Sequence, residues 1–311
     1  MRTLRSLMVL VLALALVASL AACQSGPKAA GTLTDDAGRA VELTKVPERI
    51  VSLAPSNTEI LFALGLGDKV VGVTDFCDYP AEAASIAKIG GIEPNVESIV
   101  ALEPDLVLAI GGSPIVASIA GNVELLAKFE QLGLKTLILA PTNLDGVLAD
   151  IALVGQAAGA EEAATKLVAE MQAKVKSVTD KTASLSSRPV VFYELDATDP
   201  AKPFTAGPGS WHDTFIAMAG GANAAADAKS QWAQLSAEEV LAKNPDMIIL
   251  GDSNWGVNAD AVKARPGWAA MKAVQSGAIY PIDDNLLSRP GPRLADGLVA
   301  LARIIHPELF E

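Results

Sequence analysis

Short apolar runs alternate along the chain with segments whose apolar residues recur at helical spacing. The runs are rich in β-branched residues, and their hydrophobicity is continuous rather than alternating, which is typical of strands that are covered on both faces. Seven runs are predicted to be strands: residues 49–53, 69–73, 105–109, 136–139, 189–194, 246–250 and 278–282. The pattern therefore predicts an α/β protein whose sheets are mostly parallel.

One long helix is predicted between the fourth and fifth of these strands. Residues 158–184 are rich in Ala, Glu, Lys, Leu and Met, and they contain neither Gly nor Pro after Gly159. These residues are good helix formers, and no helix breaker interrupts them.

An internal repeat divides the chain into two halves. Residues 95–108 (NVESIVALEPDLVL) match residues 236–249 (SAEEVLAKNPDMII) at a constant offset of 141 residues. In each copy a capping residue begins a short helix, Pro-Asp ends it, and an apolar strand follows. We therefore predict two Rossmann-like lobes, residues 41–157 and 185–311, which the single long helix joins and between which a ligand cleft lies. Because a continuous helix bends less easily than loops, we expect a small closing motion.

The N-terminus has the pattern of an export signal. Arg2 and Arg5 precede an apolar run that is broken only by Ser19 and ends in small residues. A basic region, a short apolar region and a small-residue cleavage site are typical of a secretory signal peptide, and the run is too short for a confident membrane span. We predict that residues 1–22 are removed on export.

Cys23 stands at the predicted cleavage site. Small residues before a cysteine resemble the bacterial lipobox, which implies that Cys23 becomes the lipidated first residue of the mature protein. Residues 23–40 are then predicted to be a tether to the membrane, where several lipid chains bind firmly although a single chain binds only marginally. The location would be extracytoplasmic, in the periplasm or at the outer face of the cell membrane. An ordinary signal peptide with a chance cysteine is the alternative.

The charge balance narrows the possible partners. The 311 residues include 24 Lys and Arg against 36 Asp and Glu, and the formal charge of −12 becomes −14 when the two arginines of the signal peptide are removed. Nucleic acid is excluded as a partner, because its binding depends on basic surfaces. With Cys23 lipidated, Cys77 has no cysteine left to pair with. We expect Cys77 to be a small buried residue, and a metal-sensing thiol at the cleft edge is the alternative.

The motifs of common α/β enzymes are missing from the sequence. Only His212 and His306 are present, and no Cys/His cluster has the spacing of zinc ligands. There is no G-x-S-x-G elbow and no Walker motif, and no G-x-G-x-x-G follows the first strand. We therefore expect no catalytic residue, metal site or cofactor, with an α/β enzyme kept as an alternative class. Ser56 and Glu59 form a pattern that predicts a capping box at the first helix.

Five segments of the chain resemble a known family. Residues 49–61 (RIVSLAPSNTEIL), residues 70–80 (VVGVTDFCDYP), the two repeat copies and residues 289–293 (RPGPR) occur in the order found in the cobalamin- and siderophore-type substrate-binding proteins of ABC importers. The resemblance spans about residues 40–311. It implies a binding protein, expected to be a monomer, that delivers a bulky iron or cobalt chelate to an ABC permease and its ATPase subunits.

The repeat also carries a candidate docking pair. The family uses one glutamate in each lobe to meet arginines on the permease, and this role falls on Glu97 and Glu238, which occupy matching places near two helix N-termini. Ser236 and Glu239 predict a capping box, so Glu238 is left to project outward. Acids that merely complement the helix dipole are the alternative interpretation. A lipoprotein that only presents a surface would need neither matched glutamates nor a cleft.

Several aromatic residues fall in predicted loops and are candidates for the ligand site. Phe76 and Tyr79 follow the second predicted strand, and Phe204 and Trp232 lie in the second half of the chain. In the cobalamin-binding members the positions that match Phe76, Phe204 and Trp232 hold aromatics against the corrin, so the resemblance ranks cobalamin first, ahead of a ferric siderophore or haem. Two further aromatic positions of that pattern correspond to about Gly91 and Ile110, where this chain has none.

The remaining candidates have two interpretations each. Trp211 either lines the site together with Trp255 or belongs to the core, whereas Trp268 is predicted to be structural. Arg289 either donates to an anionic group of the ligand or pairs with Asp284. Arg293 is predicted to start the final helix.

Overall fold

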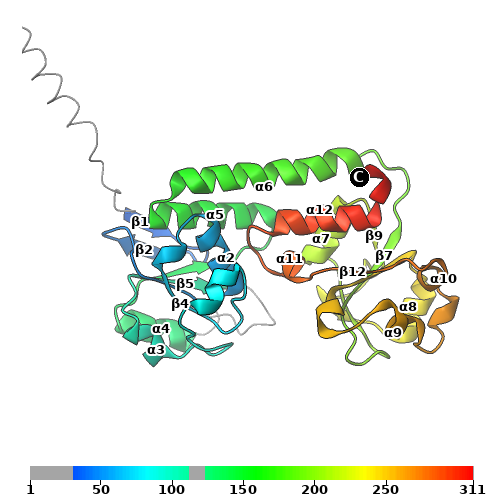
Figure 1. The fold of residues 1–311 in the computed structure, drawn as a ribbon, viewed down its shortest axis with the longest axis horizontal. Helices are drawn as coiled ribbons and strands as arrows, with labels where there is room; N and C mark the ends of the chain where they lie inside the picture. Colours follow the sequence, from blue (N-terminus) through cyan, green and yellow to red (C-terminus); the bar gives the residue numbers. More distant parts are fainter. Residues whose placement is uncertain (1–30, 112–122, 311) are drawn as a thin grey trace, which may run out of the picture.

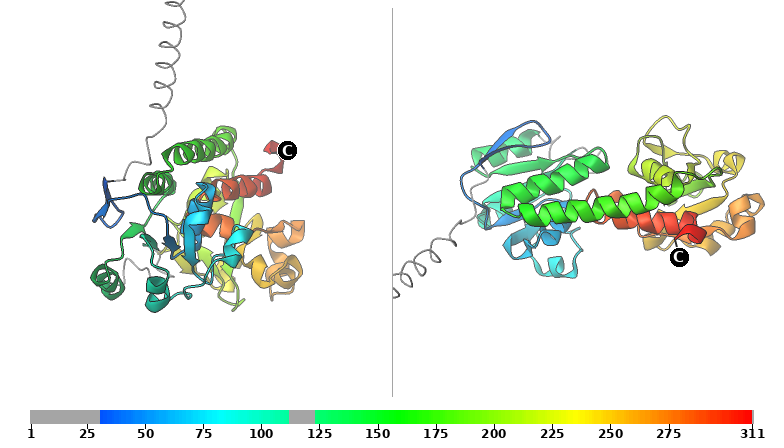
Figure 2. Two further views of the ribbon diagram at one scale, coloured as in Figure 1. Left: turned by 60° about the vertical axis from the view of Figure 1, so that its left-hand side comes forward. Right: turned by 90° about the horizontal axis from the view of Figure 1, so that it is seen from above.

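The computed structural model describes residues 31–111 and 123–310. The predicted signal peptide and Cys23 lie outside the described residues. Two α/β lobes lie side by side, and the helix α6 (Glu161–Thr182) runs across both of them (Figures 1 and 2). Gly159, with a φ of 71°, ends the preceding helix, so the long helix starts three residues after the predicted position. This architecture confirms the predicted fold class.

The N-terminal lobe is built on a four-stranded parallel sheet in the order β4-β3-β5-β6, formed by four of the predicted strands. Its strands are β3 (Ile50–Ser52), β4 (Val70–Val73), β5 (Leu106–Ile110) and β6 (Thr136–Leu139). Its helices are α2 (Pro55–Ala63), α3 (Val96–Ala101), α4 (Val123–Gln131) and α5 (Leu144–Ala158), with short 3₁₀ turns η1 (Gly67–Lys69) and η2 (Ala81–Ser85).

The C-terminal lobe has a mixed sheet in the order β10-β8-β7-β11-β12, with β9 beside β7. Three predicted strands, β7 (Val190–Asp196), β11 (Met247–Leu250) and β12 (Ile279–Pro281), are parallel, as is the short β9 (Ala222–Asn223). The antiparallel edge comprises β8 (Phe204–Ala206) and β10 (Trp232–Gln234). The helices are α7 (Trp211–Met218), α8 (Ala237–Lys243), α9 (Ala259–Lys263), α10 (Lys272–Ser276), α11 (Asn285–Ser288) and α12 (Leu294–Ile305), with 3₁₀ turns η3 (Gly251–Trp255), η4 (Trp268–Ala270) and η5 (Pro307–Leu309).

A hairpin replaces part of the predicted tether. The strands β1 (Gly31–Thr34) and β2 (Ala40–Leu43) pair antiparallel. Asp36 joins this hairpin to the N-terminal lobe, because its backbone N–H donates to Ile138 at 3.1 Å and its carboxylate accepts from Ala140 N at 2.6 Å. The prediction that the tether extends to residue 40 is therefore wrong for residues 31–40, which are folded onto the lobe.

The two repeat copies have the same backbone. Glu103 and Asn244, which are 141 residues apart, both follow the short helix with a positive φ, 45° and 44°, although neither is glycine. Two residues later, Asp105 accepts the backbone N–H of Arg49, and Asp246 accepts that of Val190. Each Pro-Asp thus connects the end of its helix to the start of a neighbouring strand. This shared connection explains why the same residues occur in both copies of the repeat.

The largest cluster of buried apolar side chains runs beneath α6 and reaches both lobes. It includes Val147 of α5, Met171 of α6 and Leu298 of α12. Burying one such side chain contributes about 1.5 to 3 kcal/mol, so this shared core holds both lobes to the long helix. Within the described residues, no helix combines the length and the apolar character that crossing a membrane requires.

Candidate ligand-binding site

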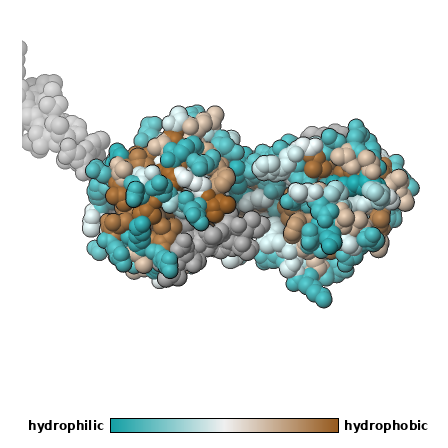
Figure 3. All heavy atoms as spheres, turned by 90° about the horizontal axis from the view of Figure 1, so that it is seen from below, coloured by the Kyte–Doolittle hydropathy of each residue, from teal (hydrophilic) through white to brown (hydrophobic). Residues whose placement is uncertain are grey.

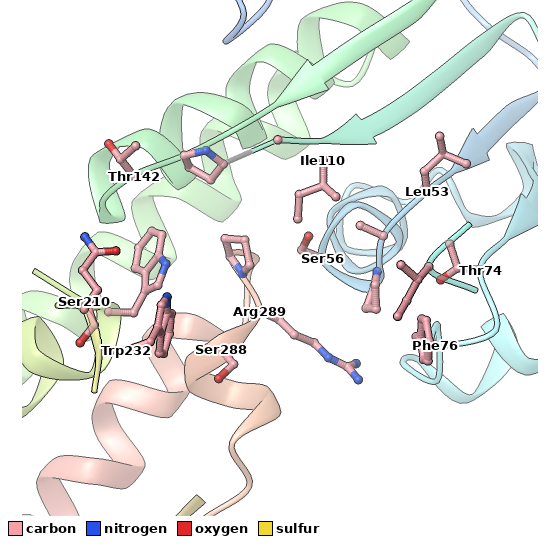
Figure 4. Close-up of a pocket in the computed structure, with 18 of the residues that line it drawn as sticks. Leu53, Ser56, Thr74, Phe76, Ile110, Thr142, Ser210, Trp232, Ser288 and Arg289 are labelled. Atoms are coloured by element: carbon pink, nitrogen blue, oxygen red, sulfur yellow. The ribbon is translucent and has the colours of Figure 1, made fainter. Parts of the chain in front are cut away.

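A cavity of about 340 Å³ lies between the two lobes (Figure 4). The N-terminal lobe lines it with the segments that follow its strands, and in α/β sheets the carboxyl ends of strands are where ligands bind. The C-terminal lobe contributes the start of α7, the start of β10, and the segment 288–290 that leads toward α12. The site is therefore incomplete in either lobe alone.

The N-terminal wall is mostly apolar. Phe76 follows β4 and is 52% exposed, and Ile92 is 55% exposed, so both present apolar surface to the cavity that they line. A Cβ atom added at Gly91 would lie 3.3 Å from the Phe76 ring. The space that an aromatic would occupy at Gly91 in the family pattern thus borders the ring of Phe76.

The C-terminal wall carries two tryptophans. Trp211 is the first residue of α7, where Ser210 caps the helix by accepting the N–H of Asp213. Trp211 lines the cavity and also packs against Phe215, with ring centroids 6.3 Å apart. Trp232 lines the same wall from β10, and its Nε1 is buried without a hydrogen-bond partner in the described part of the chain.

Two predicted ligand residues do not line this cavity. In the ladder between β8 and β10, Phe204 lies opposite Gln234, two residues away from Trp232. The side chain of Phe204 is 43% exposed. Tyr79 lies in a second groove beside α6, where the guanidinium of Arg293 stacks 4.1 Å from its ring centroid. The structure therefore does not place Tyr79 and Phe204 with Phe76, Trp211 and Trp232.

Arg289 lines the cavity but is bound by acids of the opposite lobe. Its guanidinium donates to Asp78 at 2.5 Å and to Glu59 at 3.2 Å, and Figure 4 shows the side chain extended toward the N-terminal lobe. The interpretation in which Arg289 pairs with Asp284 is therefore wrong, and the pairing with Asp78 and Glu59 was not predicted. Burial alone would lower the pKa of Arg289, but its hydrogen bonds and charge interactions with Asp78 and Glu59 raise it.

Glu59 has a different role from the one predicted. The helix α2 begins at Pro55 with Ala54 as its N-cap, so the predicted Ser56–Glu59 capping box is wrong. Proline at the first position supplies a preset φ and lacks the N–H that would need a cap. Glu59 is instead freed to accept hydrogen bonds from Arg293 at 2.6 and 2.8 Å, and Arg293 starts the final helix as predicted.

Asp284 is the centre of a polar network behind the cavity wall. Tyr193 Oη lies 2.7 Å and His212 Nε2 lies 2.9 Å from Asp284 Oδ1, while Ser288 donates to Asp284 Oδ2. Burial alone would raise the pKa of Asp284, but the hydrogen bonds from His212, Ser288 and Tyr193 lower it. No motif marked Ser288 in the sequence, because two of the three partners of Asp284, Tyr193 and His212, lie more than 70 positions from Asp284.

The remaining residues singled out from the sequence are structural or lie apart. Cys77 is buried, with Thr58 Oγ1 at 3.1 Å and Thr74 Oγ1 at 3.2 Å from its sulfur, as the buried interpretation predicts. Trp268 is fully buried against Phe192. Trp255 is 88% exposed and does not line the cavity.

Glu97 and Glu238 are exposed and stand at the second position of α3 and α8. Asn95 and Ser236 are the caps, and the predicted capping box between Ser236 and Glu239 is present. Figure 1 shows α3 and α8 on the side of the molecule opposite α6, one in each lobe. Figure 3 views this side and shows exposed apolar side chains gathered mainly on the N-terminal lobe.

A family model described as a periplasmic binding protein matches residues 50–286. This stretch includes both repeat copies and the linking helix. The chain belongs to this family of periplasmic binding proteins. Membership confirms the resemblance to the substrate-binding proteins of ABC importers, and it identifies a binding protein rather than an enzyme.

Relatives of this periplasmic binding protein match it along most of its length. The uncharacterized ABC transporter substrate-binding lipoprotein YvrC of Bacillus subtilis is 35% identical over 281 residues, 90% of this chain and 87% of that protein. A vitamin B12-binding protein of Vibrio cholerae is 32% identical over 255 residues, covering 81% and 86% of the two chains. The structure of the periplasmic heme-binding protein RhuT from Roseiflexus sp. RS-1 has a TM-score of 0.72 at 33% identity, covering 84% and 99%.

Proposed function

We propose that this chain captures a metal chelate outside the cytoplasm, cobalamin or another corrinoid first among the candidates, and delivers it to the permease of an ABC importer. The observation that carries the ligand choice is the cavity lined by Phe76, Trp211 and Trp232 from the two lobes. A corrin is a broad, largely apolar ring with neutral amide side chains, and each aromatic stacking contact adds about 0.5 to 1.5 kcal/mol beyond its buried area. Relatives named as cobalamin- and vitamin B12-binding proteins support the same choice.

A haem or ferric siderophore is the second candidate. The heme-binding neighbour is as similar in sequence as the vitamin B12-binding relatives, and Arg289 lies at the cavity where a propionate could reach it. In this structure, however, Arg289 is already bound to Asp78 and Glu59, and an anionic ligand would have to displace these carboxylates. Breaking these ion pairs would cost free energy that a neutral corrinoid does not have to supply, which favours the corrinoid.

Delivery is proposed to use Glu97 and Glu238. The two residues are exposed and occupy matching positions on α3 and α8, and both helices lie on the side of the molecule opposite α6. A permease with a pair of arginines could therefore engage both carboxylates at once. Lipidation of Cys23 is proposed to hold the protein at the membrane where that permease lies.

Titration of the purified protein with cobalamin, haem and a ferric siderophore, followed by tryptophan fluorescence, tests the ligand. Trp211 and Trp232 line the cavity, so a ligand that binds there should quench their emission. We expect cobalamin to quench at micromolar concentration or below. Absence of quenching by cobalamin, with quenching by the siderophore or haem, would transfer the assignment to that chelate.

A further inference from the structure

The chemistry of a carboxylate determines which group donates each hydrogen bond to Asp284. An ionised carboxylate accepts hydrogen bonds and donates none, so each of its partners must supply a proton. Tyr193 and His212 donate to Oδ1, and Ser288 donates to Oδ2. The side chain of His212 is fully buried, so no solvent competes for the hydrogen bond between its ring and Asp284.

Because Ser288 donates its proton to Asp284, its hydroxyl can only accept a hydrogen bond from the cavity. A serine hydroxyl has one proton and two lone pairs. The proton of Ser288 is used by Asp284, whereas the residue itself is exposed and lines the cavity. Ser288 therefore presents an acceptor to whatever occupies the space between the lobes.

A second polar group lies in the same wall but is buried. Trp232 lines the cavity, and its buried Nε1–H has no partner within the described residues. The His212 ring links the two groups: its centroid is 6.0 Å from that of Trp232, and its Nε2 is 3.4 Å from Ser288 Oγ. The Nε1 of Trp232 has no accessible surface, so the hydroxyl of Ser288 is the group of this pair that faces the space between the lobes. A primary amide offers the donor that this acceptor needs, whereas a carboxylate offers acceptors only.

We propose that Ser288 is a specificity-determining residue of this cavity, which accepts a hydrogen bond from a neutral N–H or O–H group of the ligand, such as a primary amide, and disfavours a carboxylate. The inference deepens the proposed function, because it rests on a ligand that enters between the lobes. Asp284 is a positioning residue: it orients the hydroxyl and does not itself line the cavity. The one charged side chain among the described lining residues, Arg289, is paired with Asp78 and Glu59, so it does not offset this preference.

Two matched pairs of probes test this preference independently of the ligand's identity. The first pair is cyanocobalamin and the monocarboxylic acids made by hydrolysing its side-chain amides, and the second is the diamide of haem and haem itself. In each pair the ring is constant while an amide becomes a carboxylate. The wild-type protein is expected to bind the neutral member more tightly, by about threefold to tenfold for at least one acid, which corresponds to one ordinary hydrogen bond.

Three variants separate recognition from a structural effect. Ser288→Ala should weaken binding of the neutral member by a similar factor and so reduce the difference in affinity between the two members of a pair. Ser288→Thr keeps the hydroxyl and should keep that difference. Ser276→Ala, an exposed serine on α10 away from the cavity, should change nothing. Melting temperatures of the variants show whether the fold is intact.

Each outcome decides the proposal. Equal or tighter binding of the acid by the wild-type protein overturns it, as does an unchanged difference in affinity in Ser288→Ala or an equal loss for both members. If cobalamin does not bind, the ligand assignment fails, but the haem pair still decides the role of Ser288. If neither pair binds, both proposals fail.

Discussion

Glu59 and Arg293 join the two lobes through a bidentate ion pair, with Nη2 of Arg293 2.6 Å from Oε1 and Nε 2.8 Å from Oε2 of Glu59. Glu59 belongs to α2 of the N-terminal lobe, and its side chain is 1% exposed. Arg289 donates to the same carboxylate and lines the ligand cavity. The contact that fixes one lobe against the other is thus continuous with the proposed ligand site.

Replacing Glu59 is expected to destabilise the protein strongly. Glu59→Gln would leave the guanidinium of Arg293 facing a neutral amide, whereas Arg289 keeps Asp78, and removing one partner of a buried pair costs about 3 to 5 kcal/mol. Urea unfolding measures this change in the free energy of unfolding. The matched control is Asp180→Asn, because Asp180 and its partner Lys176 are both exposed and such pairs contribute about 0 to 1 kcal/mol. Equal stability of the two variants would contradict the structural role of Glu59.

The stability of the protein should fall as the pH rises through the neutral range. Burial, followed by the charge of Asp36 and a hydrogen bond to it, raises the pKa of Asp150 from 3.8 to about 8. The folded state then keeps a proton that the unfolded chain gives up, so the free energy of unfolding decreases between pH 3.8 and about 8. Burial, with the nearby Glu194, raises the pKa of Asp252 to about 7, which acts in the same direction.

The variant Asp150→Asn isolates this effect. Its amide has no proton to lose, so the stability of the variant should decline less with pH, by at most about 1.4 kcal/mol per pH unit relative to the wild type. Urea midpoints at pH 6 and pH 8 measure the difference. Glu170→Gln, which changes an exposed carboxylate on α6, should keep the wild-type slope. An unchanged slope in Asp150→Asn would rule out a proton on this carboxyl.

Removing the two docking carboxylates should separate binding from delivery. The double variant Glu97→Ala and Glu238→Ala is expected to bind its chelate with wild-type affinity, because neither residue lines the cavity. It should fail to associate with the permease or to stimulate its ATPase in membrane vesicles. Glu162→Ala on α6, on the other side of the molecule, is the control. Full stimulation by the double variant would show that the permease is engaged elsewhere.

The sequence predicts the interior of the fold better than its edges. Continuous apolar runs mark the parallel strands because burial on both faces determines their composition. The strands β8, β9 and β10 have two or three residues and leave no such pattern, since their pairing depends on a sheet already formed. The hairpin at residues 31–43 likewise leaves no sequence signal, because Asp36 holds it to Ile138 and Ala140, which lie more than a hundred positions away.

The residues of the site also divide into those that the sequence indicates and those whose role depends on distant residues. The resemblance to the family singles out Phe76 and Trp232, and both residues line the cavity in the structure. It does not explain Arg289, whose partners Glu59 and Asp78 lie more than 200 residues away and come close only when the lobes pack. Ser288 gives no sequence signal at all: its partner Asp284 is four positions away, but Tyr193 and His212, which also bind Asp284, lie more than 70 positions away.

Uptake of radiolabelled cobalamin by cells of the source organism tests the central claim of capture and delivery most directly. Cells that lack this chain should take up cobalamin at a small fraction of the normal rate at nanomolar supply. The wild-type gene should restore the rate, and a Cys23→Ala copy should restore less, because the protein would lose its membrane anchor. Uptake of cobalamin that is unchanged by deletion of the chain would contradict the account.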